Sequence, residues 1–217
     1  MFIVEKEPKS IAAESYRTLR TNLQYSSFDE EYKVIVVTSS EPGEGKSTTA
    51  GNLALSISQG DKKVVLIDCD LRKPSLHKKF GLSNTVGLSD VIVGKESVSV
   101  VGHRYNNNLT VLTSGKIPPN PAEMLGSKSM KALIEALKKV FDYVILDTPP
   151  VQAVADAQIL STRADGTLIV VRAEKTKKDS VLNAVNLLKK VNANIVGTIL
   201  NGMDTKKNDY YYYYGDK

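Results

Sequence analysis

One short stretch, Ser39 to Thr49, constrains the fold of this chain more than any other. It follows the β-branched apolar run 34–38, which is typical of a buried strand. Apolar residues then recur at helical spacing until Gly60, at Ala50, Leu53, Ala54 and Ile57. A strand, a glycine-bearing turn, Gly-Lys-Ser and a helix form the context that a phosphate-binding loop requires. The sequence therefore predicts a nucleotide site at this position.

The residue types of the loop indicate how it would hold a nucleotide. Glycines let successive backbone N–H groups point at an anion, and the helix N-terminus adds partial positive charge. Lys46 would reach the β- and γ-phosphates, and the Ser47 hydroxyl would hold Mg²⁺. Ser40 stands where the Walker A pattern has its first Gly, which leaves open a glycine-rich turn that binds nothing. We expect nucleotide binding by Gly43, Glu44, Gly45, Lys46, Ser47 and Thr48.

Carboxylates end two further apolar runs. The run 63–67 continues into Asp68 and Asp70, which the period of a strand places on one side. The run 143–146 ends in Asp147, as a Walker B strand does. Ligands of parallel α/β sheets lie beyond the carboxyl ends of the strands, and like charges held close together need a cation or a proton. We therefore expect Mg²⁺ to be held by Ser47, Asp68, Asp70 and Asp147.

Strands and helices alternate along the rest of the chain. Further apolar strands are predicted at 109–112, 167–171 and 194–200, and helices near 127–140 and 177–192. The alternation predicts one α/β domain, residues 1–204, with a doubly wound, mainly parallel sheet. Residues 118–123 favour a rigid turn, and 103–108 favour a solvated loop. Asn201 follows the last predicted strand, and we include it among the nucleotide-binding residues.

Composition narrows the setting in which the protein works. The net charge of +5 is mild for 217 residues, and basic and acidic side chains are interleaved, so we expect no nucleic-acid partner, although an acidic partner or a membrane surface stays possible. The single Cys69 excludes an internal disulfide and suits the cytosol. No apolar run approaches the ~20 residues that span a bilayer. We expect a cytoplasmic protein that acts at a membrane only through another protein.

A predicted helix, about residues 10–27, precedes the first strand. Ala12, Tyr16, Leu19 and Leu23 form its apolar stripe, and Ser10 suits its N-cap. Beside the stripe, Glu14, Arg17 and Arg20 are spaced by three residues. Taken alone, this pattern favours a solvated face with one weak ion pair.

The last residues, 205–217, differ from the rest of the chain. They have no periodicity that a domain could bury, and they contain five consecutive tyrosines. We predict a flexible tail that carries Tyr210, Tyr211, Tyr212, Tyr213 and Tyr214.

Together these motifs resemble those of the bacterial tyrosine kinases, the cytoplasmic autokinases of Gram-positive bacteria that are linked to polysaccharide export. The likeness extends from about residue 10 to the C-terminus. Walker A corresponds to Ser40–Ser47, Walker A′ to Ile67–Arg72 and Walker B to Ile145–Pro150. The family's Glu-x-x-Arg-x-x-Arg oligomerisation motif corresponds to Glu14, Arg17 and Arg20, and its tyrosine cluster to Tyr210–Tyr214.

The resemblance implies an ATP-dependent autokinase with Lys46, Asp68 and Asp70 as catalytic residues and Tyr210–Tyr214 as phosphate acceptors. It also implies a homo-oligomeric ring, a separate transmembrane activator and a role in capsule or exopolysaccharide synthesis, with other protein substrates possible. A partition-type ATPase switch is the alternative, but those proteins carry a signature Lys where this chain has Glu41. A non-enzymatic nucleotide-binding scaffold is the third hypothesis, and the intact Lys46 and Ser47 argue against it.

Overall fold

The computed structural model describes residues 2–25 and 32–203. Two predictions lie outside the described residues, namely the tyrosine tail from 205 onward and the last two positions, 26 and 27, of the N-terminal helix. Among the helices of the described part, none is both long enough and apolar enough to cross a membrane.

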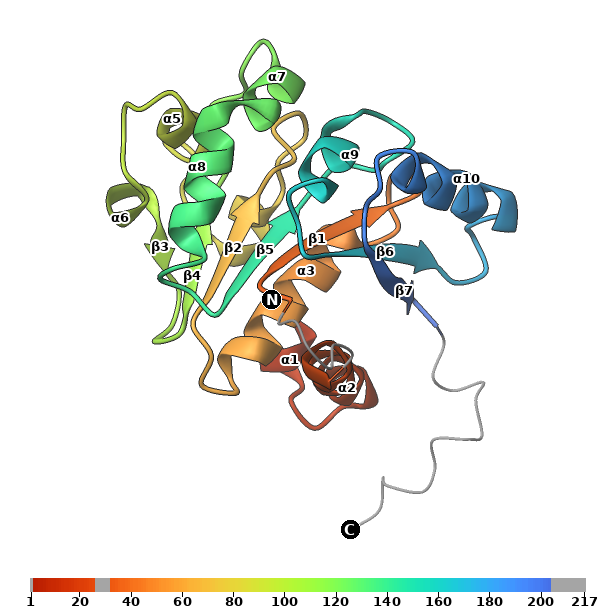
Figure 1. Cartoon of the computed structure of the whole chain (residues 1–217). Coiled ribbons are helices and arrows are strands. Elements are labelled where there is room, and N and C mark those ends of the chain that lie inside the picture. The colour runs from red at the N-terminus through yellow and green to blue at the C-terminus, as the bar shows by residue number, and fades with distance from the viewer. Residues whose placement is uncertain (1, 26–31, 204–217) are drawn as a thin grey trace.

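A seven-stranded sheet forms the middle of the described part, in the order β3-β4-β2-β5-β1-β6-β7 (Figure 1). The strands are β1 (Val34–Ser39), β2 (Val64–Asp68), β3 (His103–Arg104), β4 (Leu109–Leu112), β5 (Tyr143–Asp147), β6 (Gly166–Arg172) and β7 (Ile195–Asn201). Neighbouring strands are parallel throughout, except that β3 runs antiparallel to β4. The predicted doubly wound, mainly parallel α/β fold of the P-loop NTPase type is confirmed.

Helices cover both faces of the sheet (Figure 1). They are α1 (Ile3–Lys6), α2 (Ile11–Tyr25), α3 (Lys46–Ser58), α4 (Leu76–Phe80), α5 (Leu88–Ile92), α6 (Val98–Val101), α7 (Pro121–Gly126), α8 (Lys128–Leu137), α9 (Asp156–Ser161) and α10 (Lys178–Lys189). Ile35 and Val37 of β1 pack into a core with α1, α2 and α3, whereas Val34 and Val36 pack into a second core with α5 and α8. Because both faces are covered, the strands are continuous apolar runs rather than alternating ones.

Local differences from the sequence predictions have physical causes. In α2, the predicted stripe residues Tyr16, Leu19 and Leu23 do pack against the core, but Ala13 is buried there in place of the predicted Ala12, which is exposed. Ser10 does cap this helix, since its Oγ accepts the N–H of Ala13 at 3.2 Å. The predicted rigid turn at 118–123 leads into a helix of its own, α7, with Pro121 in its first turn.

The predicted solvated loop at 103–108 is partly regular. Its first two residues form the edge strand β3. The side-chain oxygen of Asn106 accepts the N–H groups of Asn108 and Leu109, at 2.9 and 2.7 Å. Asn106 and Asn108 are half-buried rather than solvated because they close this turn onto β4 and α3.

Candidate nucleotide site

The phosphate-binding loop joins β1 to α3 and takes a shape that depends on two glycines. Gly43 and Gly45 have φ angles of +84° and +95°, in the left-handed region that favours glycine. A Cβ atom on Gly45 would lie 2.0 Å from Nδ2 of Asn201, at the end of β7. That amide donates to the carbonyl oxygen of Glu44 at 2.9 Å. The structure thus places Asn201 against the backbone of the loop, beside the predicted nucleotide position.

The side chain of Glu44 points into the loop itself. It is buried, and its oxygens accept hydrogen bonds from the Ser40 hydroxyl at 2.9 Å, the Glu41 N–H at 2.8 Å and the Thr176 hydroxyl. Only the main chain of Glu44 is therefore available to an anion. The same contacts explain why Ser replaces the first Gly of the pattern, since the Ser40 hydroxyl holds Glu44 in place.

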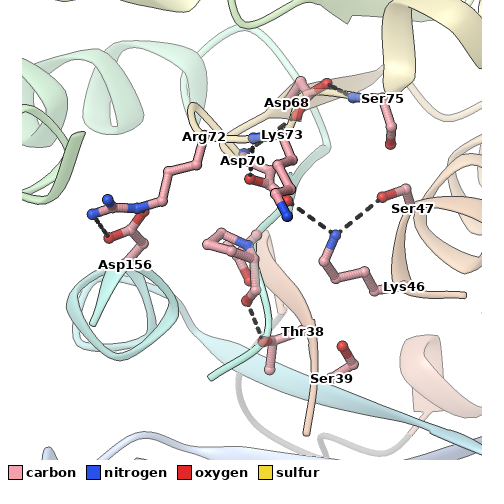
Figure 2. A network of polar contacts seen from close by, with 12 residues as sticks. Thr38, Ser39, Lys46, Ser47, Asp68, Asp70, Arg72, Lys73, Ser75 and Asp156 are labelled. Carbon is pink, nitrogen blue, oxygen red and sulfur yellow. Dashed lines mark hydrogen bonds and ion pairs between the residues drawn. The ribbon is translucent and has the colours of Figure 1, made fainter. Parts of the chain in front are cut away.

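Lys46 and Ser47 begin α3 and face the carboxylates that follow β2. Nζ of Lys46 lies 3.2 Å from Oδ2 of Asp70 and 3.4 Å from the Ser47 hydroxyl (Figure 2). Burial would lower the pKa of Lys46, but the charges of Asp147 and Asp70 outweigh burial and raise it. Lys46 therefore stays positively charged at neutral pH, at the point where the loop leads into α3.

Asp68 ends β2 and holds the next segment of the chain. Its Oδ2 accepts the N–H groups of Ser75 and Leu76 at 3.0 and 2.9 Å, and its Oδ1 accepts that of Asp70 at 3.2 Å. Burial and the nearby charge of Asp147 raise its pKa to about 7. Asp68 therefore positions the segment before α4, and its raised pKa lies near neutral pH.

Asp147 ends β5 directly opposite Asp68 in the register of the sheet. It is fully buried, and within the described residues neither of its oxygens has a hydrogen-bond partner. Burial raises its pKa to about 6, although the charge of Lys46 opposes the shift. A buried carboxylate without a donor is costly unless a ligand completes it. This orphaned side chain is the feature of the site that best fits a cation.

The described residues contain no group of three His, Cys, Asp or Glu side chains arranged as a ready-made metal cage. Asp68 is already occupied by backbone N–H groups, and Asp70 is paired with Lys46. Mg²⁺ does not require such a cage, because it keeps several waters and binds one or two carboxylates plus substrate phosphates. The residues present therefore fit Mg²⁺ that arrives with a nucleotide.

An ion pair not foreseen from the sequence lies beside the carboxylates (Figure 2). Nε and Nη2 of Arg72 donate to the two oxygens of Asp156 at 3.0 and 3.1 Å. Asp156 is fully buried in the first turn of α9. The pair joins the segment after Asp70 to the first turn of α9. The sequence carries no signal for it, because 84 residues separate the two partners.

Glu14, Arg17 and Arg20 lie on α2, which packs against α3 and not at the phosphate-binding loop. Arg17 pairs with Glu14 at 2.8 Å and donates to the Pro8 carbonyl oxygen at 2.6 Å. Arg20 donates to the Ser56 carbonyl oxygen in the last turn of α3 at 2.7 Å. Within one subunit, Arg20 thus joins α2 to the last turn of α3, whereas Arg17 joins Glu14 to the segment before α2.

Comparison with known proteins places this site in a family. The family model ParA, described as NUBPL iron-transfer P-loop NTPase, matches residues 31–210. The tyrosine-protein kinase YwqD of Bacillus subtilis is 49% identical over 216 residues, which are 99% of this chain and 91% of that protein. The kinase domain of the Escherichia coli tyrosine kinase ETK superposes with a TM-score of 0.91 and is 34% identical, covering 98% of this chain and 84% of that chain.

A second solved structure, the chimerical protein CapA2B2, has a TM-score of 0.89 and is 38% identical, covering 93% of this chain and 89% of that chain. The likeness to the Bacillus subtilis kinase extends over nearly the whole of both chains, so the matched region spans the positions of all the motifs described above. The chain belongs to the bacterial tyrosine kinase family.

Proposed function

We propose that this protein is an ATP-dependent tyrosine autokinase that transfers the γ-phosphoryl group of ATP to its own C-terminal tyrosines, Tyr210–Tyr214. The observation that carries the proposal is the juxtaposition of Lys46 and Asp70 with the orphaned carboxylate of Asp147. A phosphate-binding loop facing a buried carboxylate suits a magnesium-bound triphosphate. The 49% identity to a protein named as a tyrosine-protein kinase supports tyrosine as the acceptor.

The residues of the site have different proposed roles in phosphoryl transfer. Lys46 would bind the β- and γ-phosphates, so an entering nucleotide competes with Asp70 for its ammonium group. Ser47, Asp70 and Asp147 would hold Mg²⁺, which when bound neutralises charge on the γ-phosphoryl oxygens. As the tyrosine oxygen bonds to the γ-phosphorus, the bond to the β,γ-bridging oxygen breaks and ADP leaves.

The tyrosine hydroxyl must lose its proton in this step, because its ordinary pKa is near ~10. Asp68 is the proposed acceptor of that proton. Its pKa, raised by burial to about 7, is close to the value that suits a general base at neutral pH. The hydrogen bonds from Ser75 and Leu76 fix the orientation of the carboxylate.

A partition-type ATPase switch remains the competing function, and Glu41 counts against it. Where that class has its signature Lys, the Glu41 carboxylate instead accepts the hydroxyl of Ser180 in α10. An acidic side chain at this position cannot neutralise the phosphates of a partner's nucleotide.

The family also suggests a setting for the kinase. We propose a ring of identical subunits joined through Glu14, Arg17 and Arg20, and a separate transmembrane protein that activates the kinase at the inner face of the membrane. The process it regulates would be capsule or exopolysaccharide synthesis. A ring would bring a neighbour's site close to each tail, because a heterologous interface of this kind can close on itself.

Incubation of the purified full chain with Mg-ATP, followed by detection of phosphotyrosine, tests the kinase proposal. Lys46→Met should abolish the signal and leave the fold intact, because Lys46 faces the site and not the core. Replacement of Tyr210–Tyr214 with Phe should abolish the signal but keep ATP binding. ATP hydrolysis without phosphotyrosine would favour the ATPase switch, and persistent wild-type labelling of the five-Phe variant would exclude the tail as the main acceptor.

A further inference from the structure

A second lysine, Lys79, lies at the phosphate-binding loop and has no part in the motifs identified from the sequence. It belongs to α4, and its Nζ donates to the hydroxyl of Thr48 at 2.9 Å. Thr48 is the third residue of α3, so this ammonium group lies beside the helix N-terminus that would bind phosphate. Within the described residues Lys79 forms no ion pair, in contrast to Lys46, which is paired with Asp70.

The position of Lys79 follows from the way α4 is held. Backbone N–H groups at the start of the helix bind Asp68. Leu76 and Phe80 are buried in the core, where the Phe80 ring packs 4.5 Å from that of Phe2. A helix fixed at its start and along its buried side leaves its exposed side chains a limited range. The backbone of Lys79 is therefore fixed beside the loop, and its exposed side chain reaches the site from a defined point, as its bond to Thr48 shows.

The local charge also favours an anion there. Burial is the main cause that raises the pKa of Asp147, and Lys79 is among the positive charges that oppose this shift, so its field reaches the metal carboxylate. The ammonium group of Lys79 now donates to a neutral hydroxyl. If it donates to a phosphate oxygen instead, it forms a stronger, charge-assisted hydrogen bond.

We propose that Lys79 binds an oxygen of the α-phosphate, so that two lysines from different elements hold the bound nucleotide. The inference rests on the proposed nucleotide site and adds a residue to it. ATP and ADP share this phosphate, and its charge does not change during transfer, whereas the β-phosphate gains charge as ADP leaves. Lys79 therefore contributes to the affinity for both nucleotides equally and does not stabilise the transition state selectively.

The test compares Lys79→Met with Lys79→Arg and with Lys78→Met, a matched control because Lys78 is an exposed neighbour on the same helix. Calorimetry on the full chain measures binding of Mg-ADP and Mg-ATP, and the phosphotyrosine assay gives kcat and KM. Lys79→Met should weaken both nucleotides about tenfold and raise KM by the same factor, with kcat unchanged at saturating ATP. Lys79→Arg should restore most of the affinity, and Lys78→Met should match the unaltered protein.

Equal affinities of Lys79→Met and Lys78→Met would overturn the inference. A lower kcat, or a loss of affinity confined to ATP, would also overturn it, because either would place Lys79 on the β- or γ-phosphate, where charge changes during transfer. Nucleotide binding by the unaltered chain and its dependence on Lys46 test the site itself. The ratio of the nucleotide affinities of Lys79→Met and Lys78→Met tests the role of Lys79. The two proposals can therefore fail separately.

Discussion

Asp147 shows at the scale of one residue how a ligand site can cost stability. Its carboxylate is buried, and no described residue donates to either oxygen. Burial raises its pKa from 3.8 to about 6, so the folded protein binds this proton more tightly than the unfolded chain does. The stability that protonation contributes is present below about pH 4 and is lost as the pH rises through 6.

Asp147→Asn should therefore stabilise the metal-free protein at pH 8 by about 3 kcal/mol and remove phosphotyrosine formation. Below pH 4 the gain should vanish, because Asp147 is then neutral in both states. Urea unfolding in a chelator at pH 4, 6 and 8 measures the difference, with the exposed Glu135→Gln on α8 as the control. An Asn variant with the pH dependence of the unaltered protein would contradict this account.

The residues of the site differ in how far the sequence could predict them. Lys46, Ser47 and the three carboxylates were predicted together because each follows a strand or begins a helix in a recognisable pattern, and the structure brings them to one edge of the sheet. Their roles in catalysis stay predictions. Arg72–Asp156 and Lys79–Thr48 were missed, since a side-chain pair distant in sequence has no local signature.

At the scale of elements, α4 connects the N-terminal segment to the carboxylates of the candidate site. Asp68 binds the backbone just before it, and Phe80 at its end contacts Phe2 and Tyr105, with ring centroids 4.5 and 4.9 Å apart. The segment around Phe2 was not predicted, because a single short helical turn such as α1 has too few residues to show periodicity. The long strands and α3, by contrast, were predicted to within one or two residues.

Phe2→Ala should destabilise the protein by about 3 kcal/mol, since it leaves a cavity between α3 and α4. It should also slow phosphotyrosine formation more than Ile11→Ala, an exposed apolar change on α2, because α4 loses its support. Thermal unfolding and initial rates at saturating ATP, measured below both melting temperatures, give the two effects. A destabilised Phe2→Ala protein with the full initial rate would show that α4 keeps its place without this contact.

At the scale of the whole molecule, α2 is the element through which we propose that subunits meet. The isolated subunit already uses part of this surface, as Arg20 binds the Ser56 carbonyl and Arg17 binds Glu14. The side chain of Glu14 is 67% exposed and keeps acceptor capacity for a neighbour. An interface on α2 would add contacts between subunits to those that Arg17 and Arg20 already make within one subunit. The same surface of α2 would then support both α3 and assembly.

Simultaneous replacement of Glu14, Arg17 and Arg20 with Ala should give smaller particles than the unaltered chain in light scattering. Arg20→Ala alone should in addition lower the melting temperature, because the Ser56 carbonyl loses its donor. The exposed Lys9→Ala is the control for a charge change near this helix. Equal particle masses, with the unaltered chain already monomeric, would remove α2 from the account of assembly.

The brace between Asn201 and the phosphate-binding loop has a consequence for how the tail and the nucleotide influence each other. Asn201 holds the Glu44 carbonyl, and the sequence runs from there through Met203 into the tyrosine segment. The last described strand is thus bonded to the phosphate-binding loop a few residues before the tyrosines that the site is proposed to modify. Thermodynamic reciprocity then applies: by whatever factor a captured tail changes the affinity for ATP, ATP changes the capture of the tail by the same factor. If a phosphate on a tyrosine weakens capture of the tail, it also removes whatever effect the captured tail has on the affinity for ATP.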